Sequence, residues 1–158
     1  MPTGRYNFLS GLGLAFVLDR APTMSYSVVN TSVPEVSVPI TKTPSPFTTI
    51  SRGGDKAEFS PLSVTFKVDE ELANYLEIFN WMVGVGFPES FDQYQTPTHS
   101  DGSLIILSSN MNPVYSVRFK NLTPTSLSGF AMNVASGTVE YVECTATFDY
   151  DYYTIQKV

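Results

Sequence analysis

The residues of this chain that could do chemistry are few and poorly placed for it. The one histidine, His99, stands in the polar segment QTPTHSDGS, where Asp101 and several hydroxyl groups suggest a Ser/His/Asp site. Nothing that resembles a nucleophile elbow accompanies these residues, and an exposed turn is the simpler interpretation. The sequence therefore predicts no catalytic residues and no enzyme activity.

Metal-binding and paired-carboxylate chemistry also lack the necessary spacing. His99 and the single cysteine, Cys144, match no common spacing of zinc ligands. Glu70 and Glu71 are adjacent, and adjacent helical side chains diverge by about 100°, so their carboxyl groups cannot share one site. We expect no metal and no cofactor. The lone Cys144 fits a reducing compartment and excludes an internal disulfide, while an intermolecular bridge stays open.

The charge balance argues against nucleic-acid binding. Fifteen acidic and nine basic residues give a net charge of −6 at pH 7. No segment approaches the roughly 20 apolar residues that a membrane-spanning helix needs, so no membrane partner is expected. Tight binding through phosphate neutralisation is not expected either, because the basic residues are scattered along the chain. They are Arg5, Arg20, Lys42, Arg52, Lys56, Lys67, Arg118, Lys120 and Lys157.

Most of the chain has the period of two that is typical of half-buried strands. In 62–68, for example, Leu62, Val64, Phe66 and Val68 alternate with polar residues. The pattern predicts a mainly β fold, a β-barrel or β-sandwich of six to seven antiparallel strands. The clearest candidate strands lie at 14–18, 24–29, 62–68, 103–107, 115–120 and 141–148.

One segment changes to a helical period. Asp69 can cap its first turn, and Gly84, Gly86 and Pro88 mark its end. We therefore predict one α-helix at about 69–83. Trp81 lies beside its apolar stripe and is expected first in the core and second at a subunit interface. The stripe itself has residues three or four positions apart, namely Leu72, Tyr75, Leu76, Phe79, Met82 and Val83.

The segment at about 33–59 is rich in proline, with Pro34, Pro39, Pro44 and Pro46. This density of proline excludes a helix and a central strand, and it indicates an extended arm or a long β-hairpin. A loop of this length in a compact domain is uncommon unless it is functional or disordered. No composition break divides the chain, so we predict a single domain over 1–158 that carries this arm.

The order of these features resembles a known family. A hairpin broken at SVP leads to the arm, and a strand then enters an acidic helix in VTFKVDEELANYLEIFNWM. Two β-segments joined by LTPTSLSGFAMN follow, and the Tyr-rich strand VECTATFDYDYYTI closes the pattern. This order, roughly from Leu14 to Tyr153, resembles the tail tube proteins of contractile-tailed bacteriophages. Those proteins are similar in fold to the tube protein of type VI secretion systems.

The resemblance implies a structural virion protein. Six copies would form a ring, and rings would stack into a tail tube that conducts DNA without binding it specifically. Sheath and baseplate proteins would be further partners, with assembly in the host cytoplasm before the virion is released. Polar strand faces then become candidates for the channel wall, namely Thr65, Lys67, Glu143 and Thr145. Candidates for inter-ring or subunit contact are Thr43, Pro44, Pro46, Phe47, Arg52 and Trp81.

Two alternatives stay open. The chain could be a tube-fold relative, such as a baseplate protein, a tube initiator or a head-tail connector, because sequence does not separate these from the tube itself. It could also be a ligand-binding β-sandwich module, whose aromatic residues would include the segment DYDYY at 149–153. The second alternative predicts a stable monomer with a concave aromatic pocket.

Overall fold

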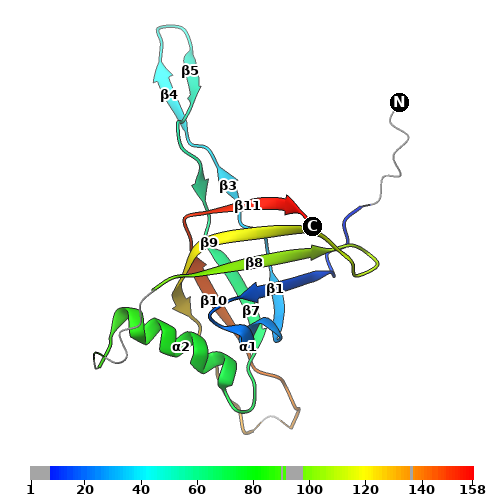
Figure 1. Ribbon diagram of the computed structural model, residues 1–158. Coiled ribbons are helices and arrows are strands. Elements are labelled where there is room, and N and C mark those ends of the chain that lie inside the picture. The colour runs from blue at the N-terminus through cyan, green and yellow to red at the C-terminus, as the bar shows by residue number, and fades with distance from the viewer. Residues whose placement is uncertain (1–7, 90, 92–97, 136) are drawn as a thin grey trace.

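The computed structural model describes residues 8–89, 91, 98–135 and 137–158, and these form a mainly antiparallel β structure with one long helix (Figure 1). The elements in chain order are β1 (Leu14–Leu18), α1 (Pro22–Ser25), β2 (Val28–Thr31), β3 (Val36–Ser37), β4 (Ile40–Pro44), β5 (Thr49–Gly53), β6 (Glu58–Phe59), β7 (Leu62–Lys67), α2 (Ala73–Gly86), β8 (Ser100–Leu107), β9 (Pro113–Leu127), β10 (Glu143–Asp149) and β11 (Tyr152–Lys157).

The main sheet has two halves, and its longest strand, β9, takes part in both. β9 pairs with β8 and β11 along its N-terminal part and with β10 at its C-terminal end. One half therefore contains β1, β8, β9 and β11, and the other contains β2, β7, β10 and the end of β9. The two halves enclose the core between them in a sandwich-like arrangement (Figure 1). The mainly β prediction is thus confirmed, with a sandwich rather than a closed barrel in the single chain.

The core combines the apolar faces of both halves with one face of α2. The alternation in β7 and β10 sends Val64, Phe66 and Phe148 inward, where each is fully buried. Phe16 and Phe119 contribute from the other half of the sheet. Burial of apolar side chains on this scale is the dominant favourable term in folding, and it fixes the register of these strands.

The prediction that two β-segments are joined by LTPTSLSGFAMN is wrong for its first half. Residues 122–127 continue β9 as a strand, and Leu122 is fully buried. Pro124 is tolerated there because this end of β9 pairs with β10 and the register shifts beside it, between Thr147 and Phe148. Proline is acceptable at a bulge or an edge strand, where it withholds no essential ladder hydrogen bond.

The candidate strand at 24–29 is also partly wrong. Pro22 occupies the start of α1, a position where its fixed φ angle and missing N–H suit a helix. The chain then enters β2 at Val28. Met24, whose apolar side chain suggested a strand, is instead fully buried from the short helix.

Helix α2 begins four residues later than the predicted 69–83 segment and ends at Gly86. No side-chain cap comes from Asp69, so that prediction is wrong. Asn74 organises the entry instead: its Oδ1 accepts a hydrogen bond from the Asp69 amide at 3.2 Å, and its Nδ2 donates to the Lys67 carbonyl at 2.7 Å. Asn74 is fully buried, and these bonds offset its desolvation.

The face of α2 that packs on the core differs in part from the predicted stripe, of which Tyr75 and Met82 are partly buried against the core. The buried residues are Asn74, Ile78, Trp81 and Gly84, whereas Phe79 of the predicted stripe is 47% exposed. The helix is apolar on more than one side, so periodicity alone could not select the inward face. Part of its apolar surface consequently faces outward.

The arm at 36–59 leaves the body as two successive two-stranded ladders. β3 pairs with β6 next to the body, and β4 pairs with β5 farther out. Figure 1 shows the β4–β5 hairpin projecting beyond the sheets, at the end of the molecule opposite α2. The chain therefore has one narrow, extended end and one broad end.

Candidate assembly surfaces

The polar face of β7 and β10 brings together the four residues predicted to line a channel. Glu143 lies opposite Lys67, and Thr145 lies opposite Thr65 in the next pair on the same face. The Thr65 and Thr145 hydroxyl oxygens are 3.1 Å apart, which is hydrogen-bonding distance. The Lys67 ammonium sits 5.0 Å from the centre of the Tyr141 ring, a cation–π contact.

This face consists mainly of short hydroxyl side chains. Ser63 and Thr147 form the next cross-strand pair, and Asn30 of β2 lies opposite Thr65 from the other side. The Ser128 hydroxyl accepts a hydrogen bond from the Thr145 amide at 2.8 Å. The reverse side of the same strands is core, so the half-sheet has one apolar face and one uniformly polar face.

Both edges of this half-sheet end in short strand segments. In the described part of the chain, β2 pairs with β7 alone, and the last residues of β9 pair with β10 alone. Unpaired edges of this kind offer backbone N–H and C=O groups to another strand. The half-sheet can therefore accept a further strand on either side.

The β4–β5 hairpin carries five of the six predicted contact residues. Thr43, Pro44 and Arg52 belong to its strands, and Pro46 and Phe47 belong to its turn. The Ser45 amide donates to the Thr48 carbonyl at 2.9 Å and closes the turn. The Phe47 side chain is completely exposed at the tip. An apolar ring displayed in this way indicates an interaction surface.

The sixth predicted contact residue, Trp81, lies in the core instead of on the surface. It is 3% exposed, and its ring packs 6.2 Å from that of Phe148. Its Nε1 donates a hydrogen bond to the Thr98 carbonyl at 2.9 Å, and the Arg20 guanidinium lies 5.1 Å from its ring centre. These neighbours leave Trp81 almost no surface to offer another subunit.

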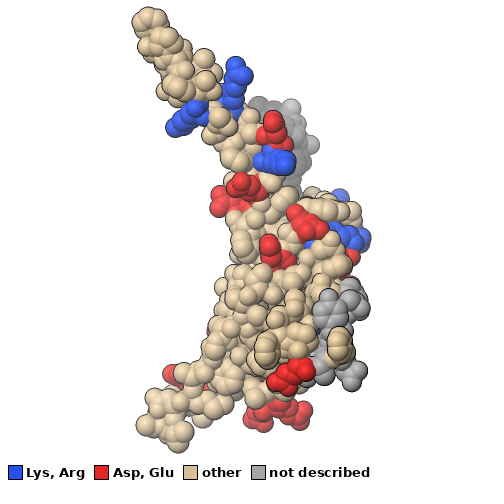
Figure 2. Space-filling model, turned by 90° about the vertical axis from the view of Figure 1, so that its left-hand side faces the viewer, with Lys and Arg blue, Asp and Glu red and all other residues tan. Residues whose placement is uncertain are grey.

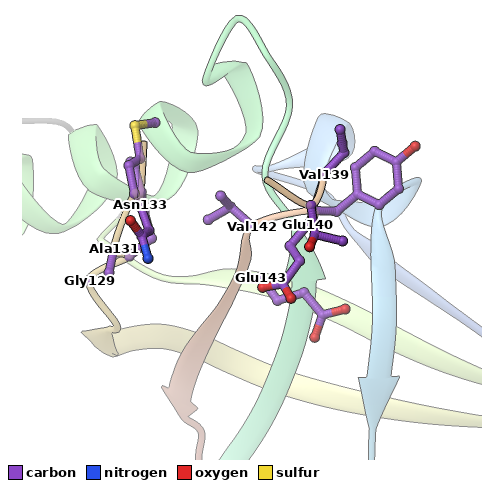
Figure 3. A pocket seen from close by; sticks show the side chains of 11 residues that line it. Gly129, Ala131, Asn133, Val139, Glu140, Val142 and Glu143 are labelled. Atoms are coloured by element: carbon purple, nitrogen blue, oxygen red, sulfur yellow. The ribbon is translucent and has the colours of Figure 1, made fainter. Parts of the chain in front are cut away.

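A further candidate surface, at the end opposite the hairpin, was missed by sequence reasoning. The segment between β9 and β10 exposes four large apolar side chains and borders a hollow of about 500 Å³. Figure 3 shows Ala131 and Asn133 on one side of this hollow and Val139 and Glu140 on the other. The exposed apolar residues are Met132, Val134, Val139 and Tyr141. Their spacing has neither a helical nor a strand period, which is why no pattern marked them.

The charges of the molecule are distributed unevenly between the two ends. Lys42 and Arg52 lie on the β4–β5 hairpin, and 40–53 contains no acidic residue. Figure 2 shows basic side chains near the top, acidic ones below them, and a further group of acidic ones at the bottom. The acidic end contains the residues that precede α2 and those that enter β10, namely Asp69, Glu70, Glu71, Glu140 and Glu143. The two segments meet at the Val68 amide, which donates to the Val142 carbonyl at 2.9 Å.

Of the residues that suggested chemistry, Asp101 makes structural contacts and Cys144 is buried. Asp101 accepts hydrogen bonds from the Lys120 ammonium and, at 3.3 Å, from the Asn121 amide. The bond from Lys120 is the main cause that lowers the pKa of the Asp101 carboxyl. His99 is exposed, and Cys144 is buried, which raises the pKa of its thiol. Among the described residues no three His, Cys, Asp or Glu side chains converge as a metal site would require.

The aromatic segment DYDYY does not form an open binding platform. Tyr150 and Tyr153 pack edge-on against Phe59 at ring distances of 6.1 and 5.3 Å. Their hydroxyls donate to backbone carbonyls at the base of the arm, Tyr150 to Ser60 at 2.7 Å and Tyr153 to Pro34 at 3.0 Å. These tyrosines therefore anchor the arm to the body. None of the described helices has the length and apolar character of a membrane-spanning helix.

Comparison with known proteins identifies the family. No family model matches the chain. The tail tube terminator protein of Enterobacteria phage T4 is 30% identical to it over 132 residues, which are 79% of this chain and 74% of that protein. The chain belongs to this tail tube terminator family. The predicted resemblance to tail tube proteins is thereby confirmed.

Comparison with solved structures shows that this chain has the fold of cap and terminator proteins of contractile systems. The tube-terminating cap of the anti-feeding prophage superposes with a TM-score of 0.69 at 11% identity, covering 98% of this chain and 95% of that one. The sheath/tube terminator of an extracellular contractile injection system gives 0.69 at 10% identity, with coverages of 97% and 99%. A type six secretion system protein gives 0.55 at 16% identity, with coverages of 92% and 83%.

Proposed function

We propose that this protein is a structural component that closes the end of a phage tail tube as a ring of six copies. The observation that carries the proposal is its 30% identity to a tail tube terminator over most of both chains. The sequence pattern had suggested the tube itself, with an end-of-tube relative as the alternative. The terminator relationship favours the end of the tube over its length.

The half-sheet of β2, β7, β10 and the end of β9 supports ring formation. It has a polar face, an apolar face covered by its own core, and two edges able to pair with other strands. Pairing β2 of one copy with the β9 edge of the next would continue the sheet around a ring. The polar face with Thr65, Lys67, Glu143 and Thr145 would then line the channel, since the opposite face is buried.

The proposed channel wall suits the passage of DNA. Its hydroxyl side chains are short, and Lys67 is offset by Glu143 directly opposite. The chain as a whole carries a net charge of −6. A surface without clustered cations neutralises few DNA phosphates. It therefore displaces few of the counterions around the DNA and binds the DNA weakly. A conduit needs this weak interaction, because the DNA must slide through it.

The arm supports attachment to the tube. It places the exposed Phe47 at the far end of an uncharged tip, away from the half-sheet that would form the ring. We propose that the hairpin reaches the adjoining ring of the tube. The other neighbours of the protein would be sheath and baseplate proteins of the same particle. The protein would assemble in the host cytoplasm and be located in the virion tail. No step of this role needs a catalytic group or a cofactor.

Electron microscopy with a mass measurement in solution tests the ring. We expect rings with a central channel and a mass of six chains, alone or after addition of tail tubes polymerised from the tube protein of the same phage. Deletion of 43–52 is expected to keep the fold, judged by circular dichroism, and to abolish attachment to tube ends. A protein that stays monomeric with and without tubes would contradict the ring, and normal attachment of the deletion variant would contradict the role of the arm.

A further inference from the structure

The core-facing side of the half-sheet formed by β1, β8, β9 and β11 extends beyond the core. Phe16, Leu104 and Val117 lie side by side on this side of the sheet, and all three are buried. Tyr115 lies two positions from Val117 on β9 and so points to the same side, yet it is 43% exposed. Ile155 lies opposite Val117 on β11 and is 57% exposed. Tyr115 and Ile155 form what we call the sheet overhang.

Helix α2 also extends beyond the core, at its C-terminal end. Ile78 is fully buried, whereas Val85, which lies two helical turns later on the same side, is 37% exposed. Phe87 ends the helix, where its amide donates to the Val83 carbonyl at 2.8 Å, and its side chain is 74% exposed. Val85 and Phe87 form the helix overhang. Each overhang thus has an apolar surface that no other part of the described chain covers.

The two overhangs lie on opposite sides of the molecule. In Figure 1, α2 ends beyond the sheets on the side where the C-terminal end of β9 lies, and the arrowheads of β8 and β11 lie on the other side, towards β2. The end of β9 and β2 are the two edges of the other half-sheet. If β2 of one copy pairs with the β9 edge of the next, the sheet overhang of the first copy therefore meets the helix overhang of the second.

We infer that the helix overhang of one copy packs beneath the sheet overhang of its neighbour in the ring. This inference rests on the proposed function. A second copy of the chain fits as the occupant because every copy supplies both surfaces, and their burial against each other is favourable. The contact joins two different surfaces, so it can continue from copy to copy until the ring closes. An incomplete ring leaves one overhang of each kind in water, which favours closure.

Cysteines placed on the two overhangs test the inference. Val85→Cys together with Tyr115→Cys, treated with a short bismaleimide, is expected to give a ladder of linked chains up to the size of the ring in a denaturing gel. Each single variant is expected to give no linked chains, because the two surfaces differ. Val85→Cys with Val17→Cys is the matched control and should not link. Val17 is 42% exposed, as Tyr115 is 43% exposed, but it lies on the opposite face of the same half-sheet.

Charge substitutions give a second readout that does not depend on crosslinking. Ile155→Glu and Phe87→Glu each place a carboxylate at an exposed position, so the fold of the single chain should be kept, judged by circular dichroism. Each is expected to raise the protein concentration at which rings dissociate by about tenfold or more, because the carboxylate would be buried at the joint. Val17→Glu is the control and is expected to stay within about twofold. Sedimentation velocity measures the dissociation.

The possible outcomes separate this contact from the ring itself. Rings that form normally from both Glu variants and give no ladder from the double-cysteine variant would overturn the contact and leave the ring standing. Linked pairs from Val85→Cys alone would indicate that two helices meet symmetrically, which also contradicts it. If the unmodified protein forms no rings, alone or on purified tube ends, the proposed function itself is wrong.

Discussion

The Gly54 amide donates a 2.7 Å hydrogen bond to the Pro39 carbonyl, and a Cβ atom added at Gly54 would lie 2.4 Å from that same oxygen. This bond closes the base of the β4–β5 hairpin, immediately after Gly53 pairs with Ile40. A side chain at 54 cannot coexist with it, because backbone rather than a flexible side chain is in the way. The direction of the hairpin therefore depends on a glycine.

Gly54→Ala is expected to misdirect the hairpin without unfolding the body. Attachment to tube ends should fall about tenfold or more, because a displaced tip loses its contacts, whereas the melting temperature should change little. Gly53→Ala is the control, since a Cβ there meets nothing within 4 Å. Binding to immobilised tubes and thermal unfolding by circular dichroism measure the two effects. Equal binding by both variants would show that the closed hairpin base is unimportant.

The sequence predicted the strands of the body well because each has one buried face. The alternation in β7 and β10 follows directly from that condition. The strand pairing itself, which brings the polar channel-wall candidates of β7 opposite those of β10, was not predicted. Periodicity does not predict where the segment 128–142 lies, because the apolar residues of this segment have neither a strand nor a helical period. Charge separation between the two ends also depends on the fold, since the acidic residues come from two distant segments.

The helix shows the limit of periodicity more directly. Trp81 and Ile78 face the core although the predicted stripe ran through Leu76 and Phe79. Both sets have helical spacing, and the inward face also contains Asn74, whose buried side-chain amide donates a hydrogen bond to the Lys67 carbonyl. A polar residue in the core contributes nothing to a hydrophobic pattern, so the pattern did not predict that Asn74 faces inward.

Trp81→Ala should therefore destabilise the fold strongly. Removing a buried tryptophan leaves a cavity and is expected to cost about 3–5 kcal/mol of the free energy of unfolding. Phe79→Ala on the outer face of the same helix should cost about 1 kcal/mol or less. Urea unfolding monitored by circular dichroism measures both values. Similar losses from the two variants would contradict the observed orientation of α2.

The Tyr150 hydroxyl provides a test of the arm anchor through pH. Burial is the main cause that raises the pKa of Tyr150 to about 12, from an ordinary value of 10.0. Because the folded pKa is the higher one, the stability that this tyrosine contributes is complete below pH 10 and is lost as the pH rises from about 10 towards 12.

Tyr150→Phe isolates this contribution. At pH 8 the variant should be less stable by about 0.5–1.5 kcal/mol, the value of a hydrogen bond such as that to the Ser60 carbonyl. Above pH 10 the difference should shrink, since the unfolded wild-type chain gains stability by ionising Tyr150 and the variant does not. Urea unfolding at pH 8, 9, 10 and 11 gives the comparison. A difference that is constant with pH would show that Tyr150 ionises equally well in both states.

The proposed channel wall can be tested by giving it the charge that it lacks. Ser63→Lys with Thr145→Lys adds two positive charges per subunit to the polar face, on neighbouring strands and away from the core. If this face lines the channel, rings of the variant should bind double-stranded DNA at low salt and release it as salt rises, because the new cations converge around one lumen.

The matched control is Leu76→Lys with Asn80→Lys, which adds the same charge to exposed positions of α2. There the cations would be spread around the outside of the ring, and DNA binding should stay near the wild-type level in a gel-shift assay. Equal DNA binding by the two double variants would place the polar face outside the channel.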